Sequence, residues 1–312
     1  MLAGCLSKGK AINGVARFTT QALSDDLKVS FANCVNLVRT HDYENYIWCM
    51  QLDKVDRPAV LAIRAYNVET SLIAERVTKG GAMLREMRYK WWDDTISAIY
   101  KGNPPDHPVA KALASVIETR HLTRYRLKKI ASTRAKDAVR QGPPETLASI
   151  EDYVDGTTGQ MMLLQMEAVG VGDVATGEAT QFAGKAVGLT SLLRGSIHHA
   201  QQGSSYLPKD ICDAHGVYMS IMMRGEASDG VRQVVKEVAT RAKGYIEQAR
   251  GLMDDIPKKA RPLLLPVTVA DMYLDALEKR EFNVFDPEWT RKSVWPIWLP
   301  IKLKYMMSLG HF

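Results

Sequence analysis

The sequence has few cysteines, and no pattern suggests that they are joined. Its 312 residues include four cysteines, and no two of them have the C-x-x-C spacing of redox and zinc-binding motifs. One of them, Cys5, lies near the N-terminus in a segment of different composition from the rest. We therefore do not expect a disulfide scaffold. A small number of cysteines without a pairing pattern is typical of proteins in a reducing compartment.

Long hydrophobic runs and several common catalytic motifs are also missing. No stretch approaches 18 consecutive apolar residues, and Met161–Gly172 is interrupted by Gln165 and Glu167, which predicts a buried core helix. The sequence has no G-x-x-x-x-G-K-[ST], G-x-S-x-G or H-E-x-x-H motif. These absences argue against a membrane-spanning protein and against the P-loop, serine-hydrolase and zincin classes of enzyme.

Acidic residues are absent from residues 1–24, which contain Lys8, Lys10 and Arg17 among scattered Ser and Thr. This composition is typical of a mitochondrial transit segment, and a disordered basic terminus is the alternative. The whole chain has 41 basic and 35 acidic residues, and the leader supplies +3 of the net charge of +6. Because the body is only weakly basic, the charge argues against nucleic acid as a partner.

Helical spacing dominates the long intervals between prolines. These intervals are residues 59–103, 109–142, 145–207 and 209–256. In Val231–Met253, for example, apolar residues recur every three or four positions and predict one buried stripe. We expect inter-helix loops at Lys101–Pro108 and Gln141–Pro144, and a central helix at Glu145–Gly170. The sequence therefore predicts an all-α fold.

The segment Gly184–Pro208 resembles the diphosphate-binding helix of squalene and phytoene synthases, A-x-Q-L-T-N-I-L-R-D-x-x-E-D-x-x-x-G-R-x-Y-L-P. The residues that fit this pattern are Leu189, Thr190, Leu193, Arg194, Gly203, Tyr206, Leu207 and Pro208. The two family aspartates fall on Gly195 and His199, and Ser204 replaces an arginine that clamps phosphate. A Mg²⁺-diphosphate site needs anionic oxygen ligands, and neither glycine nor neutral imidazole supplies one.

A second stretch, Leu61–Glu75, resembles the first acidic helix of the same family. The residues in register are Ala62, Ala65 and Tyr66. Two metal-binding aspartates of the family fall on Ser71 and Glu75, so one carboxylate remains of the four that the family uses. The resemblance implies a vestigial pocket formed by Ser71, Glu75, Arg194, Gly195, His199, Ser204 and Tyr206.

Two further blocks are closer to the family pattern. Arg88–Pro108 resembles R-L-x-W-W-R-x-x-L-x-x-x-x-x-G-x-P-x-H-P, and Val154–Gly159 resembles V-A-G-x-V-G. With four blocks in family order, the chain is identified as a member of the squalene/phytoene synthase superfamily. Leu37–Leu52, Arg64–Glu69 and Tyr206–Val217 resemble the mitochondrial complex I assembly factor branch more closely than the true synthases.

The resemblance implies a single isoprenoid-synthase-type helical bundle around a central cavity, with no cofactor. It implies a catalytically inactive protein that acts in assembly of mitochondrial NADH dehydrogenase (complex I), peripheral on the matrix face of the inner membrane. The expected partners are complex I subunits or other assembly factors. Two alternatives stay open: a structural accessory subunit of a mature mitochondrial complex, respiratory or ribosomal, and an active prenyl-diphosphate synthase with an unusual metal site.

Histidines and a cysteine near the second motif do not predict a zinc site. His198 and His199 are adjacent and diverge by about 100° on a helix. Cys212 and His215 supply only half of a tetrahedral site. We therefore expect no metal, and we expect His199 to fill the volume of the missing aspartate.

The C-terminal segment combines aromatic and basic residues. Residues 289–312 contain three of the six tryptophans of the chain together with four basic residues, namely Trp289, Trp295, Trp298, Arg291, Lys292, Lys302 and Lys304. This composition suits contact with an anionic membrane surface, whereas Pro296 and Pro300 are expected to exclude a regular helix through its centre. A tail that packs on the helical body or on a protein partner is the alternative. We divide the chain into a leader (1–24), a helical domain (25–280) and this tail (281–312).

Overall fold

Helices account for the regular secondary structure of residues 24–77, 81–290 and 295–312, the part of the chain that the computed structural model describes. They are α1 (Asp25–His41), α2 (Tyr43–Cys49), α3 (Arg57–Ser71), α4 (Ile73–Arg76), α5 (Gly81–Ile99), α6 (Pro108–Thr119), α7 (Arg124–Ala138), α8 (Leu147–Val154), the π-helical η1 (Asp155–Gly159), α9 (Gln160–Ala168), α10 (Val174–Arg194), α11 (Ser196–Gln201), α12 (Lys209–Ala214), α13 (Met219–Met223), α14 (Asp229–Gly251), the 3₁₀ segments η2 (Met253–Asp255), η3 (Arg261–Leu264) and η4 (Pro287–Thr290), α15 (Pro266–Glu278) and α16 (Trp295–Leu309). The predicted all-α class is confirmed. The leader predicted for residues 1–24 lies outside the described residues, apart from Ser24.

Capping side chains and prolines set where many helices begin. Four helices start after a side chain that accepts a hydrogen bond from a backbone amide three residues on, and these capping residues are Ser24, Thr146, Asp173 and Ser228. Such a cap satisfies one of the amides that the first helical turn leaves without a partner. Three more helices have a proline in the first turn, at Pro58, Pro108 and Pro266. At these positions proline loses no intrahelical bond.

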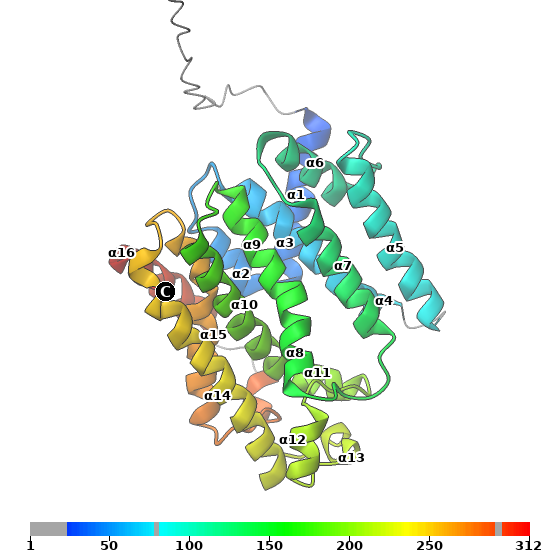
Figure 1. Ribbon diagram of the computed structural model, residues 1–312, viewed down its shortest axis with the longest axis vertical. Coiled ribbons are helices and arrows are strands. Elements are labelled where there is room, and N and C mark those ends of the chain that lie inside the picture. The colour runs from blue at the N-terminus through cyan, green and yellow to red at the C-terminus, as the bar shows by residue number, and fades with distance from the viewer. Residues whose placement is uncertain (1–23, 78–80, 291–294) are drawn as a thin grey trace, which may run out of the picture.

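The long helix α14 carries the stripe that its periodicity predicts. Val231, Val234, Val235, Val238, Ala242, Tyr245, Ile246 and Ala249 are all buried. Figure 1 shows α14 beside α10 and α15 on one side of the molecule, while α5 and α7 lie side by side on the other. The stripe faces α10, so burial of one apolar face joins this helix to the centre of the bundle.

The central helix predicted for Glu145–Gly170 consists of α8, η1 and α9, and α10 crosses it at very short range. A Cβ atom added at Gly184 would lie 2.6 Å from the Cα atom of Gly159. A Cβ added at Gly188 would lie 2.5 Å from the Cβ of Val154. These distances are shorter than side-chain packing tolerates, so glycine is required for the backbones to meet.

Helix α7 joins this crossing to α3. The backbone of Gly156 in η1 contacts α7 so closely that a Cβ there would lie 2.5 Å from Thr133 Oγ1. Helix α7 also contacts α3, where the buried Tyr66 hydroxyl donates to the carbonyl of Leu127 at 2.7 Å. The contacts of Gly156 and Gly159 are therefore helix packing.

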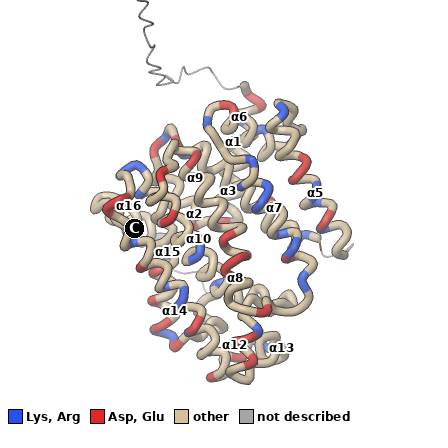
Figure 2. The backbone as a smooth tube through the Cα atoms, viewed as in Figure 1, with Lys and Arg blue, Asp and Glu red and all other residues tan. Residues whose placement is uncertain are grey.

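Charges of both signs are interspersed along most helices, as Figure 2 shows. Helix α7 is an exception, because it has six basic residues and one acidic residue, namely Arg124, Arg126, Lys128, Lys129, Arg134, Lys136 and Asp137. Its C-terminal half reaches the hollow described below, where it contributes Arg134 and Asp137.

The expectation that prolines exclude a helix in the tail is wrong. Helix α16 runs through Pro300. Pro296 is the second residue of the helix, where an amide would have no intrahelical partner, so only Pro300 removes a bond. Leu299 and Leu303 are fully buried against the body, and this burial offsets the loss.

Candidate functional site

Five of the seven predicted pocket positions line a single hollow of about 590 Å³. They are Ser71, Glu75, His199, Ser204 and Tyr206. They come from the end of α3, from α4, from α11 and from the loop after it. Other parts of the wall come from α5, α7, α8, α10 and α13. Residues more than a hundred positions apart in the sequence therefore meet at this hollow.

The two positions of the missing aspartates in the second motif are in direct contact. Gly195 ends α10, and a Cβ atom added there would lie 2.6 Å from Nε2 of His199. The imidazole of His199 also lies against the ring of Tyr206, with 4.7 Å between centroids. The ring of His199 therefore occupies the space that a side chain at position 195 would need.

Burial keeps His199 neutral near pH 7. Removal from water, and to a smaller extent the neighbouring His198, lowers the pKa of His199 from its ordinary 6.5 to about 4. A neutral imidazole adds no charge to the hollow. It serves here as an aromatic side chain that packs on Tyr206.

This buried histidine predicts how stability depends on pH. Between pH 6.5 and about 4 the unfolded chain binds a proton at His199 that the folded protein does not. The free energy of unfolding should therefore fall as the pH falls through this window, by up to about 1.4 kcal/mol per unit from this group. Urea unfolding at a series of pH values should show a shallower slope for His199→Gln than for the unaltered protein. Equal slopes would contradict the assignment.

Sequence reasoning missed the charged residues that dominate the walls. Arg85, Arg134 and Arg140 line the hollow, against two carboxylates, Glu75 and Asp137. No motif marks these arginines, and the basic bias of α7 hints at only one of them, Arg134. Four metal-binding carboxylates would make such a pocket strongly acidic, whereas here cationic side chains outnumber anionic ones.

Both carboxylates of the hollow already have partners. Glu75 lies 3.2 Å from Nε2 of His198. Asp137 accepts a hydrogen bond from Nε of Arg140 at 2.9 Å and another from the hydroxyl of Tyr206. A metal ion would have to displace these contacts.

The residues present do not fit a Mg²⁺ ion. Magnesium binds hard anionic oxygen atoms in octahedral geometry, and of the four family positions only Glu75 has a carboxylate. Three guanidinium groups line the same hollow and would repel the ion. Within the described ranges no group of three or more His, Cys, Asp or Glu side chains is placed to hold a metal.

Comparison with known proteins agrees with this arrangement of helices. Residues 38–298 match the family model Squalene/phytoene synthase. The chain belongs to the squalene/phytoene synthase family. The fold is similar to the crystal structure of a dehydrosqualene synthase in complex with ligand, with a TM-score of 0.77 at 20% identity over 91% of this chain and 98% of that one. The predicted isoprenoid-synthase-type fold is confirmed.

Two relatives within this family carry a different name. A bovine protein named NADH dehydrogenase (ubiquinone) complex I, assembly factor 6 is 32% identical over 275 residues, which cover 88% of this chain and 80% of the relative. A Dictyostelium discoideum protein named as a homolog of this assembly factor is 31% identical over 252 residues, which cover 80% of this chain and 70% of that relative. The predicted resemblance to the assembly factor branch is confirmed.

Arg194, although it fits the family motif, does not line the hollow. Its guanidinium donates two hydrogen bonds to the carboxylate of Glu44 in α2, at 2.6 and 2.8 Å, and lies 5.4 Å from the ring centre of Tyr273. The prediction that Arg194 belongs to the vestigial pocket is therefore wrong, because this side chain turns toward α2 and α15. In this squalene/phytoene synthase family member it joins helices at the surface.

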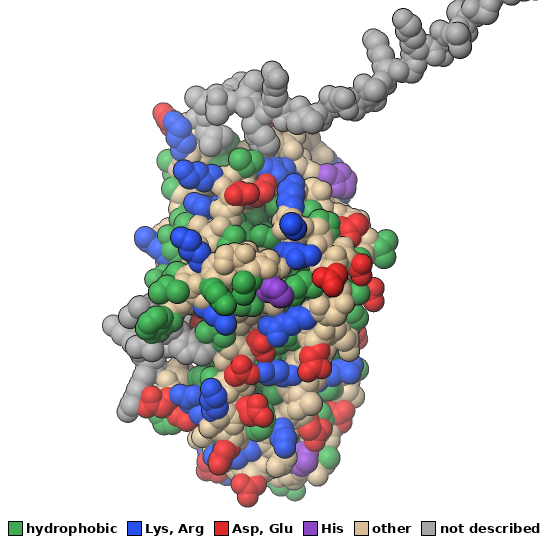
Figure 3. Space-filling model, turned by 90° about the vertical axis from the view of Figure 1, so that its left-hand side faces the viewer, with side chains coloured by type: hydrophobic (Ala, Val, Ile, Leu, Met, Phe, Trp, Pro, Cys, Tyr) green, Lys and Arg blue, Asp and Glu red, His purple; other side chains and the backbone are tan. Residues whose placement is uncertain are grey.

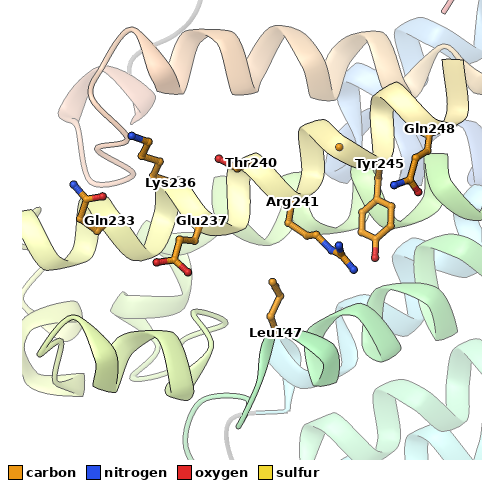
Figure 4. Close-up of a pocket in the computed structure, with 9 residues that line it drawn as sticks. Leu147, Gln233, Lys236, Glu237, Thr240, Arg241, Tyr245 and Gln248 are labelled. Carbon is orange, nitrogen blue, oxygen red and sulfur yellow. The ribbon is translucent and has the colours of Figure 1, made fainter. Parts of the chain in front are cut away.

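A second hollow, of about 530 Å³, lies along α14 and away from the family motifs. Figure 4 shows Leu147 of α8 facing Arg241 and Tyr245 across it. Arg241 donates to Glu151 at 2.6 Å, so one charge of the groove is already paired. Glu237 is likewise bonded to His215 at 2.6 Å, and we interpret this groove as a solvated helix face.

The tail residues predicted to touch a membrane fall into separate groups. Trp289 packs on the body, since its ring lies 4.8 Å from that of Tyr273 and its Nε1 donates to the carbonyl of Asn283. The prediction for Trp289 is therefore corrected. The side chains of Trp298, Lys302 and Lys304 are exposed, and that of Trp295 lies outside the described residues. None of the described helices is both long and apolar enough to cross a membrane.

Proposed function

We propose that this protein acts in the assembly of mitochondrial complex I and transfers no prenyl group. The observation that carries the proposal is the identity of 32% over 88% of the chain with a protein named complex I assembly factor 6. The solved dehydrosqualene synthase shares the fold but only 20% of the sequence. Sequence has therefore diverged less from the assembly factors than from this synthase.

The chemistry of the hollow supports the absence of prenyl transfer. Ionisation of a prenyl diphosphate needs metal ions that neutralise the leaving group, and these ions need carboxylates. Glu75 alone stands at a family carboxylate position, and the ring of His199 fills the place beside Gly195. The residues that still fit the family pattern then stabilise the fold. An example is Tyr206, whose hydroxyl donates a hydrogen bond to Asp137.

We place the protein in the mitochondrial matrix, peripheral on the inner membrane. The acid-free leader supports import into the organelle. The exposed basic and aromatic side chains of the C-terminal helix support contact with a membrane surface. Its partners are then complex I subunits or other assembly factors at that surface.

Depletion of the protein should lower the amount of assembled complex I on native gels and leave sterol and carotenoid levels unchanged. Re-expression of Glu75→Gln should restore complex I as well as the unaltered protein does, because a binding role does not use the last carboxylate. The substitution should leave the fold intact, since Glu75 and His198 form a partly exposed pair that contributes about 0–1 kcal/mol.

Three outcomes would count against the proposal. Normal complex I after verified depletion removes the assembly role. Failure of Glu75→Gln to restore complex I, at normal protein level, points to metal-dependent chemistry. Complexome profiling addresses the alternative of an accessory subunit, because such a subunit would travel with the finished complex in stoichiometric amount, whereas an assembly factor travels with early intermediates.

A further inference from the structure

The C-terminal helix α16 is docked on the body through one face. Leu299 and Leu303 are fully buried in this face, and the helix packs against α2. Phe312, just beyond the helix, is 1% exposed, and Nε of Arg250 donates to its carbonyl at 2.8 Å. The guanidinium of Arg261 donates to the carbonyl of Gly310 at 3.2 Å. The end of the chain is therefore held in place, and α16 has a defined orientation.

The opposite side of α16 is a row of exposed apolar side chains. Trp298, Ile301, Tyr305 and Leu309 are 62%, 58%, 57% and 50% exposed, respectively. They follow one another at intervals of three, four and four residues, so they lie along one side of a helix with about 100° per residue. We call these four residues the outer face of α16. A helix that is apolar on two sides is normally covered on both.

Lysines stand at both edges of the outer face. At about 100° per residue, Lys302 falls next to Trp298 and Leu309 on one edge, and Lys304 falls beyond Ile301 on the other. Both lysines are exposed. Figure 3 looks onto the side of the molecule that carries α16, where hydrophobic side chains form a band with Lys and Arg above and below it. After Glu288 the sequence has no further acidic residue.

This arrangement matches the surface of an anionic bilayer in three respects. Each side chain of the outer face is at least half exposed on the convex surface of a helix, so it can enter a soft layer without a shaped partner. Trp and Tyr prefer the headgroup level, where one part of the ring is apolar and another is polar. Lysines beside an apolar strip extend toward lipid phosphates while their stems stay with the strip.

We propose that the outer face of α16 inserts into the interfacial layer of a bilayer that contains anionic phospholipid, with the helix axis parallel to the membrane. Lys302 and Lys304 contact lipid phosphates at the two edges. The body of the protein, and with it the hollow near His199, is then held at a fixed distance and orientation from the membrane. This inference rests on the proposed function only in taking the membrane to be the mitochondrial inner membrane. Lipid binding by α16 can therefore be disproved while the role in complex I assembly stands.

Flotation of the full chain with vesicles tests the proposal directly. The vesicles are pure phosphatidylcholine, or phosphatidylcholine with one fifth cardiolipin. The unaltered protein should float with the anionic vesicles. Trp298→Ala/Ile301→Ser should lower the partition coefficient at least tenfold without changing the thermal midpoint, because both side chains are exposed. Lys302→Gln/Lys304→Gln should abolish the preference for cardiolipin, at about fivefold per lysine.

Matched variants separate membrane contact from folding. Met83→Ala/Tyr125→Ala removes exposed apolar side chains of α5 and α7, 74% and 64% exposed, and should float like the unaltered protein. Leu303→Ala removes a buried side chain and should lower the thermal midpoint, which identifies damage to the docking of α16.

Two results would overturn the proposal. If the outer-face variant floats like the unaltered protein, the face does not bind lipid. If that variant instead loses a co-purifying mitochondrial protein while flotation is unchanged, the occupant is a protein. Both results leave the role in complex I assembly untouched, because the vesicle assay contains no complex I.

Discussion

Farnesyl diphosphate incubated with the purified protein and Mg²⁺ should be recovered unchanged. Three of the four metal-binding positions are Ser71, Gly195 and His199, none of which has a carboxylate. Loss of one stabilising contact to transition-state charge costs about 2.7 to 4 kcal/mol, so three losses total about 8 kcal/mol or more. This sum lowers the rate about a millionfold or more, which places turnover below detection.

Product formation by chromatography of labelled substrate provides the measurement, with an authentic squalene synthase assayed in parallel. The chain offers its own control in Glu75→Gln, which removes the last family carboxylate. Residual product that persists in this variant and in EDTA comes from a contaminant. Turnover that disappears in both would contradict the prediction and would mean that carboxylates from elsewhere in the chain, such as Asp137, complete a metal site.

Much of the site could be predicted because the family pattern preserves its frame. Ser71, Glu75 and His199 meet at one hollow, as expected of residues that align with metal ligands. The motif could not say where Arg194 points, because its direction depends on Glu44 of a helix 150 residues away. For the same reason Arg85, which lines the hollow from α5, carries no signal in its own segment.

Helix contacts show the same difference. Contacts that depend on a segment's own sequence could be predicted, and contacts that depend on a distant segment could not. The stripe of α14 follows from its own periodicity, and it is buried as predicted. The sequence alone could not reveal that Gly159 meets Gly184 of α10. A glycine shows that a close approach is tolerated and does not identify the backbone that approaches. At Pro300 the local sequence wrongly predicts the end of a helix. The tendency of proline to interrupt a helix is outweighed there by the burial of Leu299 and Leu303.

Replacement of Arg134 by methionine should lower the free energy of unfolding by about 3 kcal/mol. Arg134 is 8% exposed, and its guanidinium donates at 2.7 Å to both the carbonyl and the side-chain oxygen of Asn67, and also to the hydroxyl of Thr70. These acceptors lie in the last two turns of α3, where the helix dipole favours a positive charge. Methionine has a similar length but donates no hydrogen bond, so the side-chain oxygen of Asn67 loses this donor and the carbonyl of Asn67 keeps only its bonds within α3.

Chemical denaturation compared with Lys136→Met isolates this contribution. Lys136 is exposed on the same helix, and its loss should change the free energy of unfolding by less than about 0.5 kcal/mol. Arg134→Lys should fall between the two, because one ammonium group cannot reproduce the planar fork that reaches both oxygens of Asn67. Because domains are stable by only about 5–15 kcal/mol, Arg134→Met should also lower the protein level in mitochondria and, through abundance alone, the level of complex I. Equal stability of Arg134→Met and Lys136→Met would show that α3 and α7 are held together by their apolar contacts, and that Arg134 is free to serve the hollow that it lines.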